Sequence, residues 1–348
     1  NGDPSNDSLV DSSPESFHGG DIKGVQDRLP YLKELGVTTL WVSPLFSMRQ
    51  IPFQGYGAFH GYWVNDLKKA ESRFGTMEDV ASLVATAHSQ DMRVFLDMVL
   101  NHVDYDAPLV KERPHWFHKR GGIEDWSDPE ELIFGDVHGL PDLAQEKSEV
   151  YDYLLEASKL WIDTTALDGF RLDAVKHISQ SFWASYNQAL RARYGRQFGL
   201  LGEVFDGSPA VLQNYMARGK FNSVFDFPLY YSVIDSVCRG GHLGKVASAL
   251  ASETLYGDAM RLVTFVDNHD LPRLRTICST EPKFERALAL WLTSRGVPSI
   301  TYGTEVGLEG AREPHNRGVM QFAPTSGTTR NIRELLRLRK AHPSMAKG

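Results

Sequence analysis

The chain has 348 residues, enough to bury a large core as one big domain or two smaller ones. Hydrophobic residues make up 42% and aromatic residues 11%, as in folded soluble proteins. The net charge of −7 comes without a long basic run, which argues against nucleic acid as a partner because phosphate contacts need clustered Lys and Arg. No apolar run reaches the roughly 18 residues that span a bilayer, so we expect no membrane partner. Nothing in the sequence indicates an obligate protein partner.

Helical patterns alternate with short apolar, β-branched runs along the chain. Met77–Ser89, for example, is expected to form an amphipathic helix that buries Val80, Leu83, Val84 and Ala87. The other expected helices are Leu29–Leu35, Val150–Thr164, Phe182–Tyr194, Leu243–Ala251, Lys283–Ser294 and Ile332–Ala341. The expected strands are Thr38–Pro44, Arg93–Leu100, Gly169–Asp173, Phe198–Val204, Ser223–Phe227, Arg261–Val266 and Ser299–Tyr302. This alternation predicts parallel βαβ units.

The seven expected strands are short and apolar, and each ends in polar residues, which favours a closed parallel barrel over an open doubly wound sheet. We therefore predict an α/β fold, a (β/α)8 TIM barrel whose first strand would precede Asn1. The barrel would comprise residues 1–102 and 140–348 and be truncated at both ends. Residues 103–139, a long loop rich in Pro, His, Trp, Gly and Asp, would form a small subdomain inserted after the third strand.

The two cysteines, Cys238 and Cys278, have no zinc-ligand spacing around them. They could form one bridge, but most pairs so far apart are simply buried thiols, and the sequence does not decide between the two.

Acidic and basic residues gather where the expected strands end, which is the active-site face of such a barrel. Arg171 and Asp173 alternate on one strand, so their side chains point the same way. The next strand leads to Glu203, and a later one leads to Asp267-Asn268-His269-Asp270. Structural ion pairs rarely recur at one end of successive strands, so this pattern indicates a reaction centre.

Such a set of groups suits the hydrolysis of glycosidic bonds. One carboxylate can attack the anomeric carbon while a carboxylic acid protonates the leaving oxygen, through an oxocarbenium-like transition state. Arg171 would keep Asp173 ionised and oriented. His102 and His269 can donate hydrogen bonds to sugar hydroxyls, and Tyr62 and Trp63 offer flat faces to a sugar ring.

Four segments resemble, in order, the signature regions of the α-amylase family of glycoside hydrolases. They are Asp97-Met98-Val99-Leu100-Asn101-His102, Gly169-Phe170-Arg171-Leu172-Asp173-Ala174-Val175-Lys176-His177, Gly202-Glu203-Val204 and Phe265-Val266-Asp267-Asn268-His269-Asp270. Flanking segments such as Phe59-His60-Gly61-Tyr62-Trp63 and Leu140-Pro141-Asp142-Leu143 agree, so the resemblance covers nearly the whole chain.

The resemblance implies a role for each matching residue. Asp173 resembles the nucleophile, Glu203 the general acid/base, and Asp270 the third acid, which grips sugar hydroxyls. The implied substrate-binding residues are Arg171, His102, His269, Tyr62, His60, Trp63, Lys176, His177, Glu313 and Arg317. Simpler interpretations stay open: His60 could be a packed core histidine, Trp63 a wall of the cleft, and Glu313 with Arg317 a surface salt bridge. Asp97 is expected to orient Arg171 rather than to react.

The resemblance also implies two calcium sites built from oxygen donors, as calcium requires. The first would consist of Asn101, Asp142 and the backbone carbonyl of His177, and would tie the long inserted loop to the barrel. The second would use residues near the start of the chain, namely Asn1, Asp3, Asn6, Asp7, Gly19 and Asp21. This Asn- and Asp-rich opening could instead be a solvated turn.

Lys176-His177 and the Leu-Pro-Asp-Leu segment resemble family members that act on α-1,4 bonds. The expected activity is a retaining hydrolase of starch-like glucans or maltooligosaccharides. Val137-His138-Gly139, where cyclising transferases place a bulky aromatic residue, favours hydrolysis over an α-glucan transglycosylase. A catalytically silent glucan-binding fragment is the third alternative. Relatives are mostly secreted or periplasmic, and the same localisation is expected here.

Overall fold

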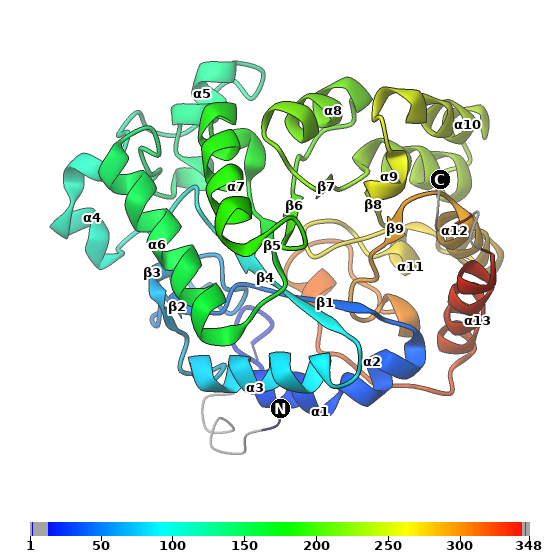
Figure 1. The fold of residues 1–348 in the computed structure, drawn as a ribbon. Coiled ribbons are helices and arrows are strands. Elements are labelled where there is room, and N and C mark those ends of the chain that lie inside the picture. Colours follow the sequence, from blue (N-terminus) through cyan, green and yellow to red (C-terminus); the bar gives the residue numbers. More distant parts are fainter. Residues whose placement is uncertain (1, 3–12, 343–344, 346–348) are drawn as a thin grey trace. The chain divides into compact units, whose positions relative to one another are not determined.

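The computed structural model describes residues 2, 13–342 and 345, which cluster into two units. Unit 1 comprises Asn1–Lys33, Val37–Val204 and Ala217–Asn222, and unit 2 comprises Glu34–Gly36, Phe205–Met216 and Ser223–Gly348 (Figure 1). Four expected calcium ligands, Asn1, Asp3, Asn6 and Asp7, lie outside the described residues.

A parallel sheet forms the centre of unit 1. Its strands follow the order β1 (Thr39–Val42), β4 (Arg93–Met98), β5 (Gly169–Leu172) and β6 (Gly199–Gly202). The register places Asp97 opposite Arg171 and Arg171 opposite Leu201. The ring of Phe95 occupies the space that a Cβ would need at Gly169 and Gly199, so only glycine allows this close packing at the start of β5 and β6.

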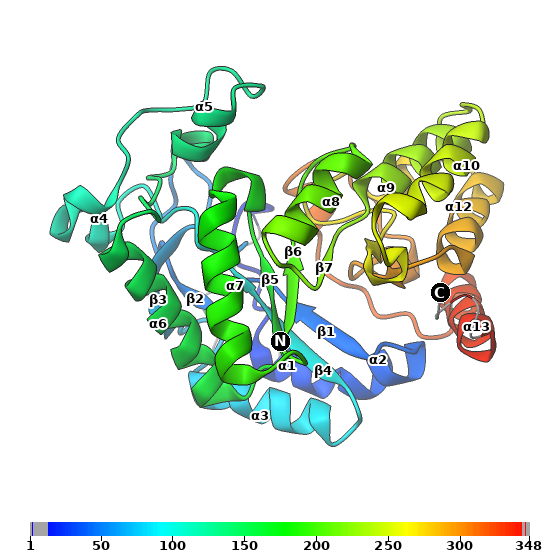
Figure 2. The same cartoon turned by 45° about the horizontal axis from the view of Figure 1, so that its top comes forward.

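Helices α3 (Met77–His88), α6 (Ser148–Thr165) and α7 (Gln180–Tyr194) lie side by side in succession along the outside of this sheet (Figures 1 and 2). Helix α3 begins with a capping box between Thr76 and Asp79, and it buries Val80, Leu83, Val84 and Ala87 as predicted. The shorter helices of this part of the chain are α1 (Ile22–Asp27), α2 (Leu29–Leu35), α4 (Pro108–Glu112) and α5 (Pro129–Phe134).

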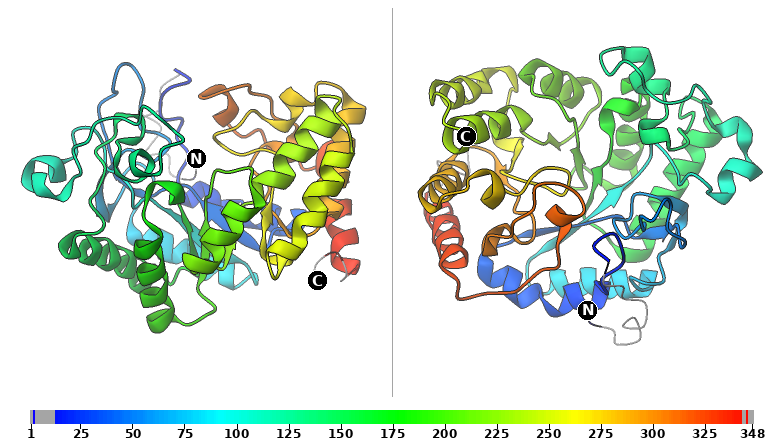
Figure 3. Two further views of the ribbon diagram at one scale, coloured as in Figure 1. Left: turned by 90° about the horizontal axis from the view of Figure 1, so that it is seen from above. Right: turned by 180° about the vertical axis from the view of Figure 1, so that it is seen from behind.

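Two features of unit 1 were not evident from the sequence pattern. Strands β2 (Phe46–Met48) and β3 (Val64–Ala70) pair antiparallel, with register shifts that weaken the alternation of apolar residues. Beside them the segment 103–139 carries α4, α5 and three-residue turns at Pro114–Trp116 (η2) and Val137–Gly139 (η3), drawn in teal in Figure 3. That this segment is a separate subdomain stays a prediction.

The later elements begin with α8 (Pro209–Arg218) and continue with β7, β8 and β9. Strand β8 (Val263–Thr264) pairs parallel with β9 (Val297–Pro298), and Phe225, just after β7 (Ser223–Val224), bridges to Val263. The other elements are α9 (Phe227–Val233), the π-helical turn η5 (Ile234–Cys238), α10 (Gly244–Ala251), η6 (Ser252–Leu255), η7 (Ala259–Arg261), α11 (Leu274–Ile277), α12 (Glu281–Thr293), η8 (Thr304–Val306), η9 (His315–Arg317) and α13 (Gly327–Ala341). Neither unit closes into a barrel by itself within the described residues.

The last predicted strand was placed too late in the sequence. Val297 and Pro298 form β9, whereas the expected strand Ser299–Tyr302 continues it only through one hydrogen bond, from the Ser299 N–H to the Thr264 carbonyl (2.8 Å). Proline lacks the N–H that a ladder uses and so marks strand edges, which hides this strand from a pattern-based prediction. No helix among the described residues is long and apolar enough to cross a membrane.

Of the two alternatives for the cysteines, the structure has the bridge and not the more common buried thiols. Cys238, at the end of η5, and Cys278, just after α11, form a disulfide within unit 2, and both are buried. They are 40 residues apart in the sequence but only 4.5 Å apart between Cα atoms, a proximity that spacing alone cannot show.

The disulfide should stabilise the folded chain by limiting the freedom of the unfolded one. We expect the Cys238→Ser/Cys278→Ser double variant to lose about 2–4 kcal/mol of unfolding free energy, measured by urea denaturation. Dithiothreitol should lower the midpoint of the wild type and leave that of the double variant unchanged. Equal midpoints for the oxidised wild type and the double variant would contradict a stabilising bridge.

Candidate active site

The carboxyl ends of β4, β5 and β6 bring three acidic side chains of unit 1 to one place. Asp97 lies within β4, Asp173 directly follows β5, and Glu203 directly follows β6. The backbone ladder continues past the strands: the Asp173 N–H donates to the Met98 carbonyl (3.1 Å) and the Glu203 N–H to the Leu172 carbonyl (2.9 Å). Parallel pairing therefore fixes the backbone positions of the residues that carry these carboxylates.

Arg171 connects all three acids. Its Nη1 lies 2.9 Å from Asp97 Oδ1 and 2.6 Å from Asp173 Oδ1, and its Nη2 lies 2.5 Å from Glu203 Oε1. Arg171 is 1% exposed and Asp97 is fully buried, so these ion pairs are shielded from water. The rigid fork of one guanidinium holds Asp173 and Glu203 close together. The prediction that Asp97 and Asp173 both contact Arg171 agrees with these distances.

Burial shifts the pKa values of the groups around Arg171. Burial raises the pKa of Asp97 to about 7, although Arg171 acts in the opposite direction. Burial also acts against the charge of Arg171, but Asp97 and Glu203 outweigh it and raise its pKa well above the usual value. Burial lowers the pKa of His102, whose Nε2 lies 3.3 Å from the Tyr62 carbonyl oxygen. Burial therefore disfavours the protonated form of this imidazole.

Two participants were missed by the sequence analysis. The Trp41 indole N–H donates to Asp97 Oδ2 (3.1 Å), beside the Tyr62 hydroxyl, which donates to the same oxygen (2.9 Å). The Ala174 N–H donates to Glu203 Oε2 (3.2 Å) from a left-handed backbone conformation with φ 49°. Trp41 could have been found from the strand pairing. It lies opposite Phe95, two residues before Asp97, so Trp41 and Asp97 lie on the same side of the sheet. A backbone donor leaves no sequence signal.

The predicted residues His60, Tyr62, Trp63 and His177 also lie in unit 1. His60 Nδ1 accepts from the Tyr62 N–H (3.0 Å), and the rings of His60 and Trp63 meet edge to face at 4.9 Å. His177 follows Lys176 in the turn η4 (Val175–His177), and its Nδ1 lies 2.9 Å from the Leu132 carbonyl oxygen of α5. The turn after Asp173 is thereby held to the inserted segment.

The remaining predicted residues form a cluster within unit 2. Asp270 contacts His269 Nε2 (3.1 Å) and Arg317 Nη2 (3.0 Å), and Arg317 Nη1 lies 3.3 Å from Glu313 Oε1. The Arg317 side chain is only 10% exposed, which does not fit a simple surface salt bridge. The part that Asp270 plays together with Asp173 and Glu203 stays a prediction.

The residues predicted for the first calcium site are suited to bind a cation. The side-chain atoms Oδ1 and Nδ2 of Asn101 and Oδ1 of Asp142 are buried without a hydrogen-bond partner, and both residues are fully buried. An unpaired buried oxygen is costly unless something compensates it. No three His, Cys, Asp or Glu side chains in the described part of the chain gather as a metal cluster, so a site here would combine an amide, a carboxylate and a backbone carbonyl.

The second predicted calcium site is mostly outside the described residues. Asp21 caps α1 and accepts hydrogen bonds from the Gly2 N–H (2.9 Å) and the Gly24 N–H (2.6 Å), and Gly19 has a φ of 81°. These contacts give Asp21 a structural use that needs no metal.

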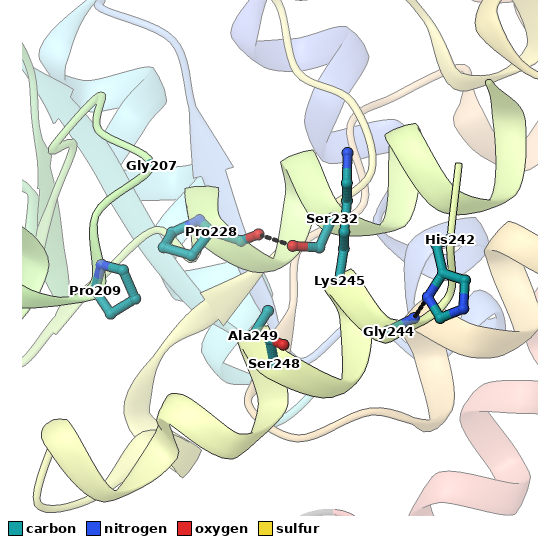
Figure 4. A pocket seen from close by; sticks show the side chains of 9 residues that line it. All are labelled: Gly207, Pro209, Pro228, Ser232, His242, Gly244, Lys245, Ser248 and Ala249. Atoms are coloured by element: carbon teal, nitrogen blue, oxygen red, sulfur yellow. Dashed lines mark hydrogen bonds between the residues drawn. The ribbon is translucent and has the colours of Figure 1, made fainter. Parts of the chain in front are cut away.

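An open groove of about 520 Å³ lies in unit 2, and its lining contains none of the predicted site residues (Figure 4). Within it the Ser232 hydroxyl donates to the Pro228 carbonyl (2.8 Å) and the Gly244 N–H to His242 Nδ1 (2.9 Å). The lining residues are Gly207, Pro209, Pro228, Ser232, His242, Gly244, Lys245, Ser248 and Ala249. The groove is thus distinct in its residues from the predicted reaction centre.

Comparison with known proteins agrees with this geometry. The alpha amylase catalytic domain family matches residues 2–131 and 108–341, so the chain belongs to the alpha-amylase family and is of the glycosidase type. It is 32% identical to the beta/alpha-amylase of Paenibacillus polymyxa over all of this chain and 30% of that protein. It is 34% identical to the cyclomaltodextrin glucanotransferase of Bacillus licheniformis over 97% of this chain and 51% of that protein. The chain thus spans about half the length or less of these two relatives.

A solved structure supports the predicted architecture. The alpha-amylase of Geobacillus thermoleovorans, complexed with acarbose, superposes with a TM-score of 0.90 at 36% identity, over 97% of this chain and 76% of that one. This likeness implies the (β/α)8 TIM barrel predicted from the sequence. The closure of the barrel and the position of its first strand stay predictions.

Arg171 should be essential to the stability of unit 1. Arg171→Met would leave Asp97 buried without its main cation, and we expect a loss of about 3–5 kcal/mol of unfolding free energy, measured by urea denaturation. Adding Asp97→Asn should recover part of that loss, because the amide needs no counter-charge. Losses that simply add in the double variant would show that the two side chains do not depend on each other.

Proposed function

We propose that this chain is the catalytic part of a retaining glycosidase that cleaves α-1,4 bonds in starch-like glucans or maltooligosaccharides by double displacement. The observation that carries the proposal is the shared contact of Asp173 and Glu203 with the guanidinium of Arg171. Two carboxyl groups held close together are what a retaining mechanism requires, with one as nucleophile and the other as acid and then base.

Each carboxyl group has a distinct task in this mechanism. Asp173, oriented by Arg171, would attack the anomeric carbon while Glu203 protonates the leaving oxygen. Glu203 would then take a proton from the water that releases the sugar from Asp173. The ion pair between Glu203 and Arg171 stabilises the deprotonated form that this second step needs.

The surrounding charges favour the same reaction. Three acids, Asp97, Asp173 and Glu203, face one base, Arg171, so the buried cluster has an excess of acidic groups. An oxocarbenium-like transition state develops positive charge, which the neighbouring carboxylate of Asp173 would stabilise while Glu203 donates its proton. In unit 2, the contacts of Asp270 with His269 and Arg317 would hold its carboxylate for sugar hydroxyls, which is the role proposed for the third acid.

The proposed substrate contacts follow from the resemblance and from the position of each side chain. His102 would donate to a hydroxyl of the sugar at the point of cleavage, and Tyr62, with His60 and Trp63 beside it, would face the ring. Lys176 and His177 would contact the leaving-group side, and Arg317 with Glu313 the donor side.

A glucanotransferase is the second candidate, because cyclomaltodextrin glucanotransferases are among the relatives at 34% identity. The two functions share the first step and differ in whether water or a sugar hydroxyl accepts the glycosyl group from Asp173. The products formed from maltoheptaose would separate them: shorter linear sugars alone indicate hydrolysis, whereas longer or cyclic products indicate transfer.

Substitution of the two carboxyl groups tests the proposed chemistry. Glu203→Gln should lower kcat by about 10²–10⁴-fold on maltoheptaose, because proton transfer is lost. Asp173→Asn should lower it at least as much, and NMR should show initial release of the α-anomer by the wild type. Asp163→Asn, a change at an exposed acid of the same unit, serves as the control.

Wild-type turnover that survives Asp173→Asn would contradict the proposed nucleophile. A folded wild type that binds maltoheptaose in the presence of calcium but does not turn it over would instead support the silent glucan-binding alternative.

Calcium is proposed as a structural cofactor held by Asn101, Asp142 and the His177 carbonyl, where it would neutralise charge and join loops without taking part in bond cleavage. A secreted or periplasmic location is proposed as well. The disulfide between Cys238 and Cys278 supports it, since disulfides persist mainly in oxidising compartments.

Removal of calcium should destabilise the protein. Chelation should lower the unfolding free energy by roughly 2.7 kcal/mol relative to a calcium concentration 100 times Kd, and added calcium should restore it. Differential scanning calorimetry with and without EGTA measures the effect as a change in Tm. The Asn101→Ala variant should have a Tm that responds less to EGTA than that of the wild type. A variant that responds like the wild type would exclude Asn101 as a ligand.

A further inference from the structure

A buried histidine links two acids next to the proposed calcium ligands. His118 Nδ1 lies 2.5 Å from Asp142 Oδ2, and His118 Nε2 lies 2.9 Å from Glu146 Oε2. The His118 side chain is 8% exposed and that of Asp142 is fully buried, whereas Glu146 is half exposed. Phe134 covers the imidazole edge to face, at 5.0 Å between ring centroids. The sequence analysis assigned no role to His118.

These contacts divide the two oxygens of Asp142 between different tasks. His118 occupies Oδ2, while Oδ1 is buried without a hydrogen-bond partner, as are the side-chain atoms of Asn101. The backbone around Asp142 is held as well: its N–H donates to Asp136 Oδ1 (3.2 Å), and its carbonyl accepts from the His118 N–H (3.1 Å). The carboxylate of Asp142 is therefore fixed in orientation with one oxygen left over.

We propose that His118 is a positioning residue for calcium, which holds Asp142 so that Oδ1 is directed to the metal together with Asn101. The proposal rests on the calcium site proposed above. His118 itself is not a ligand, because both of its ring nitrogens already contact carboxylates and calcium prefers oxygen donors. Partners that orient a ligating carboxylate typically contribute 10–100-fold to metal affinity.

His118 also gives the site a connection to the inserted segment. It lies in the segment 103–139, whereas Asn101 precedes that segment and Asp142 and Glu146 follow it. A metal held by Asn101 and Asp142 would thus be coupled, through His118, to the fold of the segment in between. Loss of the imidazole should weaken calcium binding although every proposed ligand is still present.

Isothermal titration of the metal-free chain with calcium chloride tests this role. His118→Ala should raise the Kd for calcium by about 10–100-fold. His118→Asn, whose amide can donate to Asp142 but does not reach both acids, should stay closer to the wild type than to His118→Ala. The matched control is His115→Ala, a neighbouring exposed histidine paired with Glu149, and it should leave the Kd unchanged.

A calorimetric Tm in EGTA separates a role toward calcium from a purely structural one. If His118→Ala lowers the Tm equally with calcium and with EGTA and keeps the wild-type Kd, the proposal is wrong. Asp142→Asn tests the site itself: a wild-type Kd in that variant, or no calcium binding by the wild type, would overturn the calcium site and with it the role of His118. Loss of binding in Asp142→Asn with unchanged binding in His118→Ala would overturn only the latter.

Discussion

The burial of Arg171 is the constraint on which unit 1 depends. A guanidinium that is 1% exposed needs nearby acids, and three successive parallel strands supply them as Asp97, Asp173 and Glu203. The Trp41 ring covers the cation at 5.1 Å and donates to Asp97 from its edge. A shift of register in any of these strands would separate the charges, so the strand register that allows these ion pairs also positions the proposed nucleophile and acid.

Two histidine contacts attach the inserted segment to the residues around it. His177 Nδ1 lies next to the Leu132 carbonyl, and His118 contacts Asp142. The inserted segment, which contains Leu132 and His118, is therefore attached to two of the residues proposed to bind calcium. In unit 2, Arg317 has the same organising role toward Asp270 that Arg171 has toward Asp173. In both units, an arginine with little exposed surface thus contacts a carboxylate of the predicted site.

The parts of the fold that repeat locally could be predicted from the sequence. The helix Met77–His88 shows its buried face through apolar spacing, and the strand ends show their polar residues directly. Contacts between distant segments could not be predicted in this way. The disulfide of Cys238 with Cys278 and the link from His118 to Asp142 depend on how loops of irregular shape return to each other, and no periodicity records that. The paired strands β2 and β3 were missed because register shifts disturb their alternation.

Ala174 illustrates a conflict between local and functional preferences. Its backbone is left-handed, a conformation that costs a residue with a Cβ roughly 1–2 kcal/mol, and yet this conformation aims its N–H at Glu203. Glycine at this position would relieve the strain but would also let the peptide rotate away. Sequence design that minimises backbone strain alone would therefore replace Ala174 with a residue that holds Glu203 less firmly. The protein would gain stability and lose part of the orientation of its proposed acid.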